Sequence, residues 1–177
     1  MAELDQMLDS NKEFAAGYDR GQLPMPPARG VAIVTCMDAR IDPAKALGLD
    51  IGDAHVIRNA GGRVSDDAIR SLIISSNLLG TREFIVMQHT DCGMLTFTND
   101  QLRQKLHDER GTDASDIDFL PFPALEQNVR EDVRRIQQTP HLDPDITVSG
   151  YIYDVGTGAV TEVVAAQRIG DQQVVGS

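Results

Sequence analysis

The chain has 177 residues, a length that fits one domain and can bury a sizeable core. Sixteen basic against twenty-seven acidic side chains give a formal charge of -11, which argues against nucleic acid as a partner, because phosphates are bound by clustered Lys and Arg. The apolar runs are far shorter than the roughly 18 residues that a membrane span needs, and the N-terminus lacks the order of a signal peptide, so we expect a cytoplasmic protein without a membrane partner.

An amphipathic helix is predicted at the start of the chain, from Leu4 to Tyr18, because its apolar residues recur near one helical face. Gly21 and the prolines that follow it break the chain into a loop. Residues 1–28 are therefore expected to form a helical arm ahead of the first strand. Such an arm can pack on its own domain or on a second subunit, and the sequence leaves both possibilities open.

Strand and helix patterns alternate after the arm. The segment from Arg29 to Cys36 is continuously apolar, as expected of a strand inside a parallel sheet that is covered on both faces. The alternation predicts an α/β fold with a largely parallel central sheet flanked by helices, in a single domain over residues 1–177. The tail from Gln167 is polar and expected to be loose. Further strands are predicted over 54–59, 82–88, 146–154 and 159–164, and helices from Asp42-Pro43 and over 66–79, 99–109 and 124–138.

The two cysteines, Cys36 and Cys92, each stand where a buried strand gives way to a turn, which is where open α/β sheets gather functional groups. Cys92 closes the phrase His89-Thr90-Asp91-Cys92. Two thiolates and the His89 imidazole form a three-ligand set for Zn2+ that leaves the fourth corner open, as in catalytic sites. A disulfide is disfavoured in a reducing cytosol, and two inert core thiols are the remaining alternative.

Asp38 and Arg40 follow Cys36 in the phrase Cys36-Met37-Asp38-Ala39-Arg40. They stand two residues apart in an irregular turn, so the guanidinium can grip the carboxylate through two parallel hydrogen bonds and hold it ionised. The alternative interpretation is an ordinary exposed ion pair.

At these residues the chain resembles the β-class carbonic anhydrases, whose signature is Cys-x-Asp-x-Arg followed further along the chain by His-x-x-Cys. The resemblance is to the compact members, runs from about residue 29 to about residue 163, and takes in Arg58-Asn59-Ala60-Gly61. It implies a zinc enzyme in which zinc-bound hydroxide hydrates carbon dioxide reversibly to bicarbonate, and a homodimer or higher homo-oligomer. Cys36, His89 and Cys92 would hold the metal.

The resemblance also implies roles for the Asp38–Arg40 pair. Asp38 would accept a hydrogen bond from the zinc-bound water, and Arg40 would keep Asp38 turned away from the metal. In a closed resting state Asp38 would itself become the fourth ligand. The substrate implied is small and neutral, namely carbon dioxide.

Two other functions stay open. Some relatives with the same metal set hydrolyse carbonyl sulfide or carbon disulfide, and the phrase from Cys36 to Arg40 fits that branch as well. A non-catalytic zinc protein is a further alternative, disfavoured because structural sites fill all four corners with Cys or His.

The remaining polar residues receive structural interpretations. Arg58 is expected to fix the wall of the cleft and Arg63 to belong to a solvated helix start. Asp91 is expected to act as a helix-capping charge, with a hydrogen-bond acceptor just outside the ligand set as the alternative. Among the other histidines, His55 is expected in the core or at an interface, and His107 and His141 on the solvated surface.

Overall fold

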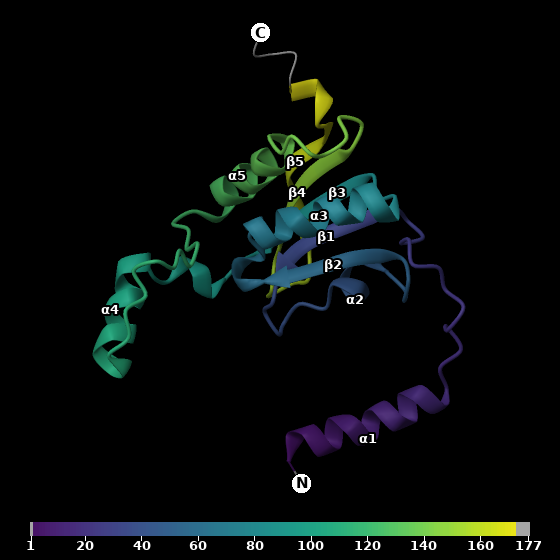
Figure 1. Cartoon of the computed structure of the whole chain (residues 1–177), viewed down its shortest axis with the longest axis horizontal. Helices are drawn as coiled ribbons and strands as arrows, with labels where there is room; N and C mark the ends of the chain where they lie inside the picture. Colours follow the sequence, from purple (N-terminus) through teal and green to yellow (C-terminus); the bar gives the residue numbers. More distant parts are fainter. Residues whose placement is uncertain (1, 173–177) are drawn as a thin grey trace.

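A five-stranded sheet forms the centre of the molecule, whose computed structural model describes residues 2–172 (Figure 1). The strand order is β2-β1-β3-β4-β5, and neighbouring strands are parallel except for the antiparallel pair β4 and β5. This arrangement confirms the predicted α/β fold with a largely parallel sheet. The strands are β1 (Val31–Cys36), β2 (Ala54–Asn59), β3 (Glu83–His89), β4 (Thr147–Tyr153) and β5 (Val160–Arg168).

The helices begin close to where the sequence signals predict. Asp42 accepts a hydrogen bond from the Lys45 backbone N–H at 3.2 Å and caps α2, and Ser65 accepts one from Ala68 at 3.3 Å and caps α3. The helices are α1 (Glu3–Ala16), α2 (Pro43–Leu47), α3 (Asp66–Leu79), α4 (Asn99–Arg110) and α5 (Leu125–Gln137), with short 3-10 turns η1 (Ala60–Gly62), η2 (Gly93–Leu95) and η3 (Gly170–Gln172).

Two hydrophobic cores cover the two faces of the sheet. The larger core packs α3 and α5 on one face, with members such as Leu72, Phe84 and Ile136 that are fully buried. The smaller core surrounds the carboxyl ends of β1 and β3, on the side of α2, and contains Cys36 and Cys92. The cysteines therefore lie in apolar surroundings at the end of the sheet where functional groups are expected.

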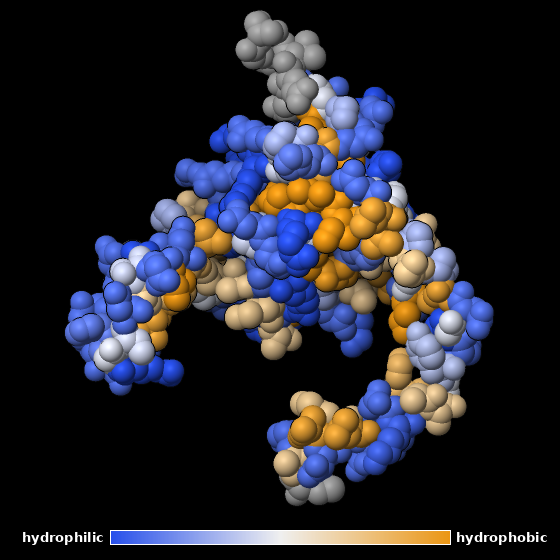
Figure 2. Space-filling view, in the orientation of Figure 1, coloured by the Kyte–Doolittle hydropathy of each residue, from blue (hydrophilic) through white to orange (hydrophobic). Residues whose placement is uncertain are grey.

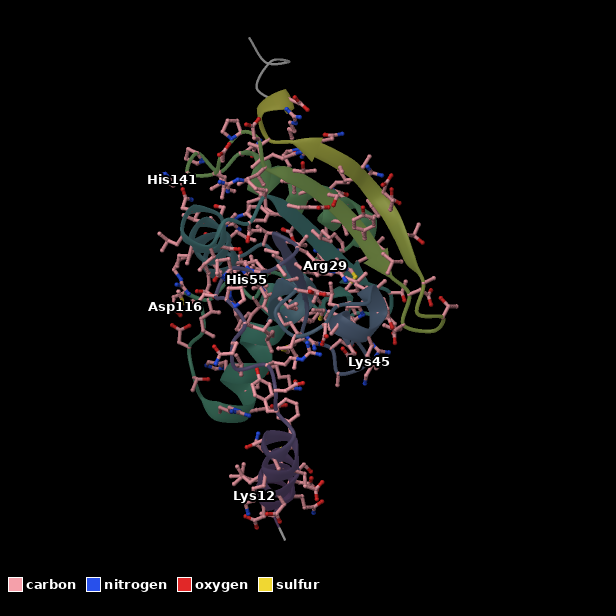
Figure 3. All side chains as sticks on the ribbon, turned by 90° about the vertical axis from the view of Figure 1, so that its right-hand side faces the viewer. Lys12, Arg29, Lys45, His55, Asp116 and His141 are labelled. Atoms are coloured by element: carbon pink, nitrogen blue, oxygen red, sulfur yellow. The ribbon has the colours of Figure 1, made fainter. Side chains whose placement is uncertain are left out.

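Helix α1 lies away from the body of the molecule, joined to it by residues 17–30 (Figure 1). It buries none of its side chains, so the structure does not show the arm packed on its own domain. Figure 2 shows apolar side chains gathered along α1, and Figure 3 places Lys12 on it, well below Arg29 and Lys45 on the body.

The C-terminal segment is more ordered than the sequence indicates. Strand β5 continues to Arg168 instead of ending at Val164, and Ile169 beyond it is 2% exposed. The Ile169 backbone N–H also donates to the Ile146 carbonyl at 3.0 Å. The expectation of a loose tail from Gln167 is therefore wrong as far as residue 172, because one apolar side chain anchors it; residues 173–177 lie outside the described range.

Between residues 2 and 172, none of the helices combines the length and the hydrophobicity that crossing a bilayer requires.

Candidate metal centre

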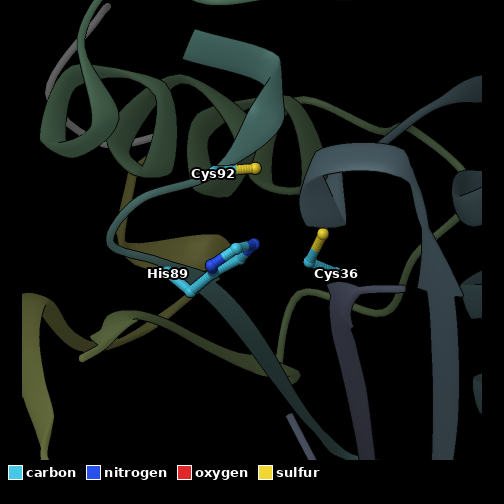
Figure 4. A group of neighbouring side chains, drawn as sticks. All are labelled: Cys36, His89 and Cys92. Atoms are coloured by element: carbon cyan, nitrogen blue, oxygen red, sulfur yellow. The ribbon is translucent and has the colours of Figure 1, made fainter. Parts of the chain in front are cut away.

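Three candidate ligands meet at the carboxyl ends of β1 and β3. Cys36 is the last residue of β1 and His89 the last of β3, and Cys92 follows in the next turn (Figure 4). The two strands are direct parallel neighbours, with Thr35 paired to Met87, as the proposed metal set requires. One ligand atom from each of the three residues lies within 4.8 Å of the other two, and all three residues are buried.

The His89 ring presents an unused nitrogen to the two sulfurs. Its Nδ1 lies 2.8 Å from the Thr90 carbonyl oxygen, which can only accept, so Nδ1 carries the hydrogen. Nε2 is buried and makes no hydrogen bond to any described residue. Because a buried polar atom normally has a partner, and two cysteine sulfurs with one imidazole nitrogen suit zinc, the cluster fits a metal ion.

The ionisation of the three groups is linked. The Cys92 thiol, the His89 ring and the backbone N–H groups of Asp38 and Gly61 together hold the pKa of Cys36 well below its usual range, against the effect of burial. The Cys36 sulfur and burial raise the pKa of Cys92. Burial lowers the pKa of His89, but the Cys36 sulfur, the Thr90 carbonyl and the Asp38 carboxylate together outweigh it, so the net shift of the pKa is upward. One thiolate therefore forms easily, whereas the second needs a cation close by.

An ion-pair network borders the cluster. The Asp38 carboxylate accepts hydrogen bonds from Arg40 Nε at 2.9 Å and from Arg40 Nη2 at 2.8 Å, so the predicted pair of parallel hydrogen bonds is present. Hydrogen bonds from Arg40 hold the pKa of Asp38 far below its usual value. Asp38 Oδ2 lies 3.8 Å from His89 Nε2, which places an ionised carboxylate oxygen at the edge of the ligand cluster.

Asp91 belongs to the same network, a possibility that the sequence raised but ranked below helix capping. Its carboxylate accepts from Arg40 Nη1 at 2.7 Å, and its backbone carbonyl accepts from Arg40 Nη2 at 3.0 Å. The expectation that Asp91 caps a helix is wrong. Its left-handed φ of 54° turns the chain so that both groups reach the guanidinium. The only sequence signal was its place between His89 and Cys92.

Backbone contacts fix the turn that carries Cys36. Arg58 donates from Nε to the Cys36 carbonyl at 3.0 Å and from Nη2 to the Asp38 carbonyl at 2.8 Å, consistent with a role in shaping the wall of the site. Gly62 packs so closely that an added Cβ would lie 2.8 Å from the Cys36 backbone nitrogen. These contacts leave the Cys36 backbone little room to move.

The other predicted residues lie apart from the cluster or differ from expectation. His55 is half-buried and its Nδ1 bonds Ser75 Oγ at 2.7 Å, whereas His107 and His141 are exposed, as expected. Figure 3 shows His141 at the outer edge of the molecule and His55 within its body. Arg63 is not solvated: its side chain is 13% exposed and pairs with the buried Asp132.

Comparison with known proteins places this arrangement in a family. Residues 31–160 match the family profile described as carbonic anhydrase. β-Carbonic anhydrase 1 of Mycobacterium tuberculosis is 47% identical over 165 residues, covering 92% of this chain and 99% of that protein. A carbon disulfide hydrolase of Saccharolobus solfataricus is 35% identical over 87% of this chain and 85% of its own length.

A solved structure agrees with the sequence comparisons. The crystal structure of a carbonic anhydrase from Streptococcus mutans superposes with a TM-score of 0.88 at 50% identity, covering 92% of this chain and 98% of that one. The match includes both strand ends that carry the Cys–His–Cys cluster, since the family profile spans residues 31–160. The chain therefore belongs to the β-carbonic anhydrase family, a family of lyases.

Proposed function

We propose that this chain is a zinc-dependent carbonic anhydrase that reversibly hydrates carbon dioxide to bicarbonate. The observation that carries the proposal is the buried cluster of Cys36, His89 and Cys92, whose ligand atoms lie within 4.8 Å of one another. These three residues would hold the ion. A bound zinc ion supplies a Lewis acid that lowers the pKa of water, and so provides a nucleophile near neutral pH.

The chain's own residues would orient the reacting water. Asp38 stays ionised because Arg40 grips both of its oxygens, so it can accept a hydrogen bond from that water and hold its lone pair toward the substrate. The same grip opposes rotation of Asp38 toward the cluster. The geometry therefore favours the state in which Asp38 is not a metal ligand, while the closed state would require part of this grip to be released.

Metal analysis and a hydration assay test the proposal together. We expect about one zinc per chain and rapid hydration in stopped-flow measurements, both lost in Cys36→Ser. Asp38→Ala should keep its zinc and lose turnover, which separates an enzyme from a protein that only binds zinc. Zinc content well below one per chain, or hydration no faster than in buffer, would overturn the proposal.

Hydrolysis of carbon disulfide or carbonyl sulfide is the second candidate function. It is supported by the 35% identity with the carbon disulfide hydrolase of S. solfataricus, while the 47% identity with the mycobacterial carbonic anhydrase favours carbon dioxide. The two candidate functions are separated by measuring turnover of carbon dioxide, carbonyl sulfide and carbon disulfide with one zinc-loaded preparation. The substrate with the highest kcat/KM identifies the function.

We also propose a cytoplasmic homo-oligomer, most simply a dimer. Neither cysteine forms a disulfide, which suits a reducing compartment. Helix α1 exposes Leu4, Met7 and Phe14 by 62%, 65% and 56%, and an exposed apolar surface of this kind fits an interface between copies. Light scattering should give at least twice the mass of one chain, and Met7→Glu should lower it.

A further inference from the structure

A buried polar cluster connects helix α5 with the end of strand β3 on the face opposite His89. At its centre is Asp132, which is 2% exposed and carries a carboxylate that accepts four hydrogen bonds. Two come from the Arg63 guanidinium, at 3.0 Å and 3.3 Å, one from the Val64 backbone N–H at 3.1 Å, and one from Gln88 Nε2 at 2.9 Å.

One branch of the cluster reaches the end of β3. Gln88 is fully buried, and besides donating to Asp132 its Oε1 accepts from Asn128 Nδ2 at 2.8 Å. Because successive side chains of a strand point to opposite faces, fixing Gln88 against α5 also fixes the direction in which His89 leaves the strand. Helix α5 thus helps to orient the ring that points into the candidate metal centre.

The other branch reaches the turn beside Cys36. The Arg63 backbone N–H donates to Asn59 Oδ1 at 2.7 Å, and its side chain donates to Asp132 and to the Leu120 carbonyl, so residue 63 is fixed at both ends. The glycine before it, Gly62, lies against the backbone of Cys36. A shift of Arg63 would therefore be passed to the turn that supports the first sulfur ligand.

A buried ion pair of this kind is weak evidence for a stabilising role, because the cost of desolvating both charges offsets most of their attraction. Among the described pairs of Arg or Lys with Asp or Glu, this one has the lowest combined exposure, 13% for Arg63 and 2% for Asp132. Its two branches end one residue from His89 and one residue from the glycine that contacts Cys36. The position of the Arg63–Asp132 pair is thus better explained by a role in orienting the candidate ligands than by a contribution to the stability of the fold.

We propose that Asp132 is a positioning residue of the metal centre, which fixes His89 through Gln88 and Cys36 through Arg63. Its described hydrogen bonds go to Arg63, Val64 and Gln88 and not to the candidate ligands, so it would act through these neighbours. The proposal rests on the proposed zinc function, since it assigns Asp132 a role in preparing the three ligands for the ion.

The test compares the zinc affinity of purified full-length variants, measured by competition with a chromogenic chelator. Asp132→Asn keeps the size of the side chain but replaces one acceptor oxygen with a donor, which would face Arg63 in one orientation of the amide and Arg63, the Val64 N–H and Gln88 in the other. The matched control is Ile136→Val, a fully buried change on the same helix within the larger core. A second readout is the thiolate-to-metal absorption band of the cobalt-loaded protein, which reports ligand geometry.

We expect Asp132→Asn to bind zinc about tenfold more weakly, at the low end of the effect of losing an outer hydrogen-bond partner, and to shift the cobalt band. Ile136→Val should leave both unchanged even though its melting temperature falls. An affinity of Asp132→Asn within about twofold of the wild type, or an equal loss in Ile136→Val, would overturn the proposal. If Asp132→Asn does not fold, Gln88→Met decides by the same criteria.

The wild-type measurement separates this proposal from the proposed function. A wild-type chain that binds zinc and hydrates carbon dioxide, with an unaffected Asp132→Asn, overturns only the positioning role. A wild-type chain that does not bind zinc overturns the proposed metal centre and this role with it.

Discussion

Replacing Gly62 with alanine tests how tightly the turn beside Cys36 is packed. An added Cβ would lie 2.8 Å from both the Cys36 nitrogen and the Thr35 carbonyl carbon, and 3.1 Å from the Thr35 Cα. These are backbone atoms of a central strand, so they cannot move aside as a flexible side chain would. Gly62 also has a φ of +61°, which an L side chain adopts only with strain.

Gly30→Ala is the matched control, because Gly30 has a φ of +62° and, apart from its chain neighbours, none of the described residues has an atom within 4 Å of the added Cβ. Both variants carry the left-handed penalty of about 1–2 kcal/mol and the same loss of chain entropy in the unfolded state. Only Gly62→Ala adds overpacking, which typically costs about 1–3 kcal/mol. In a chain of this size the extra loss corresponds to a melting temperature roughly 2–12 °C below that of Gly30→Ala.

Differential scanning calorimetry of the two variants and the wild type measures this difference, and chelator competition shows whether the strain reaches the metal centre. We expect Gly62→Ala to bind zinc more weakly and Gly30→Ala to bind it as the wild type does. Melting temperatures for the two variants that agree within about 1 °C, less than the smallest shift expected from overpacking, would contradict this prediction, because the close approach of the added Cβ to Cys36 would then have no measurable effect on stability.

Three further predictions concern the residues around the cluster. Asp38→Asn removes a carboxylate whose pKa is lower in the folded protein than its unfolded value of about 3.9. In urea unfolding the wild type should therefore have a higher free energy of unfolding than the variant above about pH 4, and this difference should shrink as the pH falls further. Asp91→Asn should lower hydration kcat/KM by up to about tenfold, because Arg40 loses an ionic partner. The free energy of unfolding should change by less than about 1 kcal/mol, because the Asp91 side chain is 79% exposed. An unchanged kcat/KM would rule out a role of Asp91 in holding Arg40. Stripping zinc with a chelator should lower the melting temperature and abolish hydration, with both restored by added zinc; recovery with magnesium alone would contradict a site built from sulfur and nitrogen.

Local patterns in the sequence were sufficient for most of the fold. The apolar run before Cys36 predicts a buried central strand, and Ser65 followed by acidic residues predicts the start of α3, because burial and capping act over a few residues. The same logic failed at the C-terminus. There a polar segment is held by Ile169, whose burial depends on a distant partner at Ile146.

The candidate ligands could also be named from the sequence, since cysteine and histidine after strand ends are uncommon and chemically specific. Cys36, His89 and Cys92 come together because β1 and β3 are neighbours in the sheet, an order the sequence suggests but does not establish. The Asp38–Arg40 pair is separated by only two residues, so its geometry is nearly local.

Long-range packing determines how the charged side chains near the candidate ligands are paired. Arg40 meets Asp91 across 51 residues, and Arg63 meets Asp132 across 69. In sequence these residues resemble surface charges, because residue type carries no record of a long-range partner or of burial. The sequence alone therefore indicated the candidate ligand atoms, whereas the pairing of Asp91 and Asp132 and the close approach of Gly62 to Cys36 depend on packing between segments far apart in the chain.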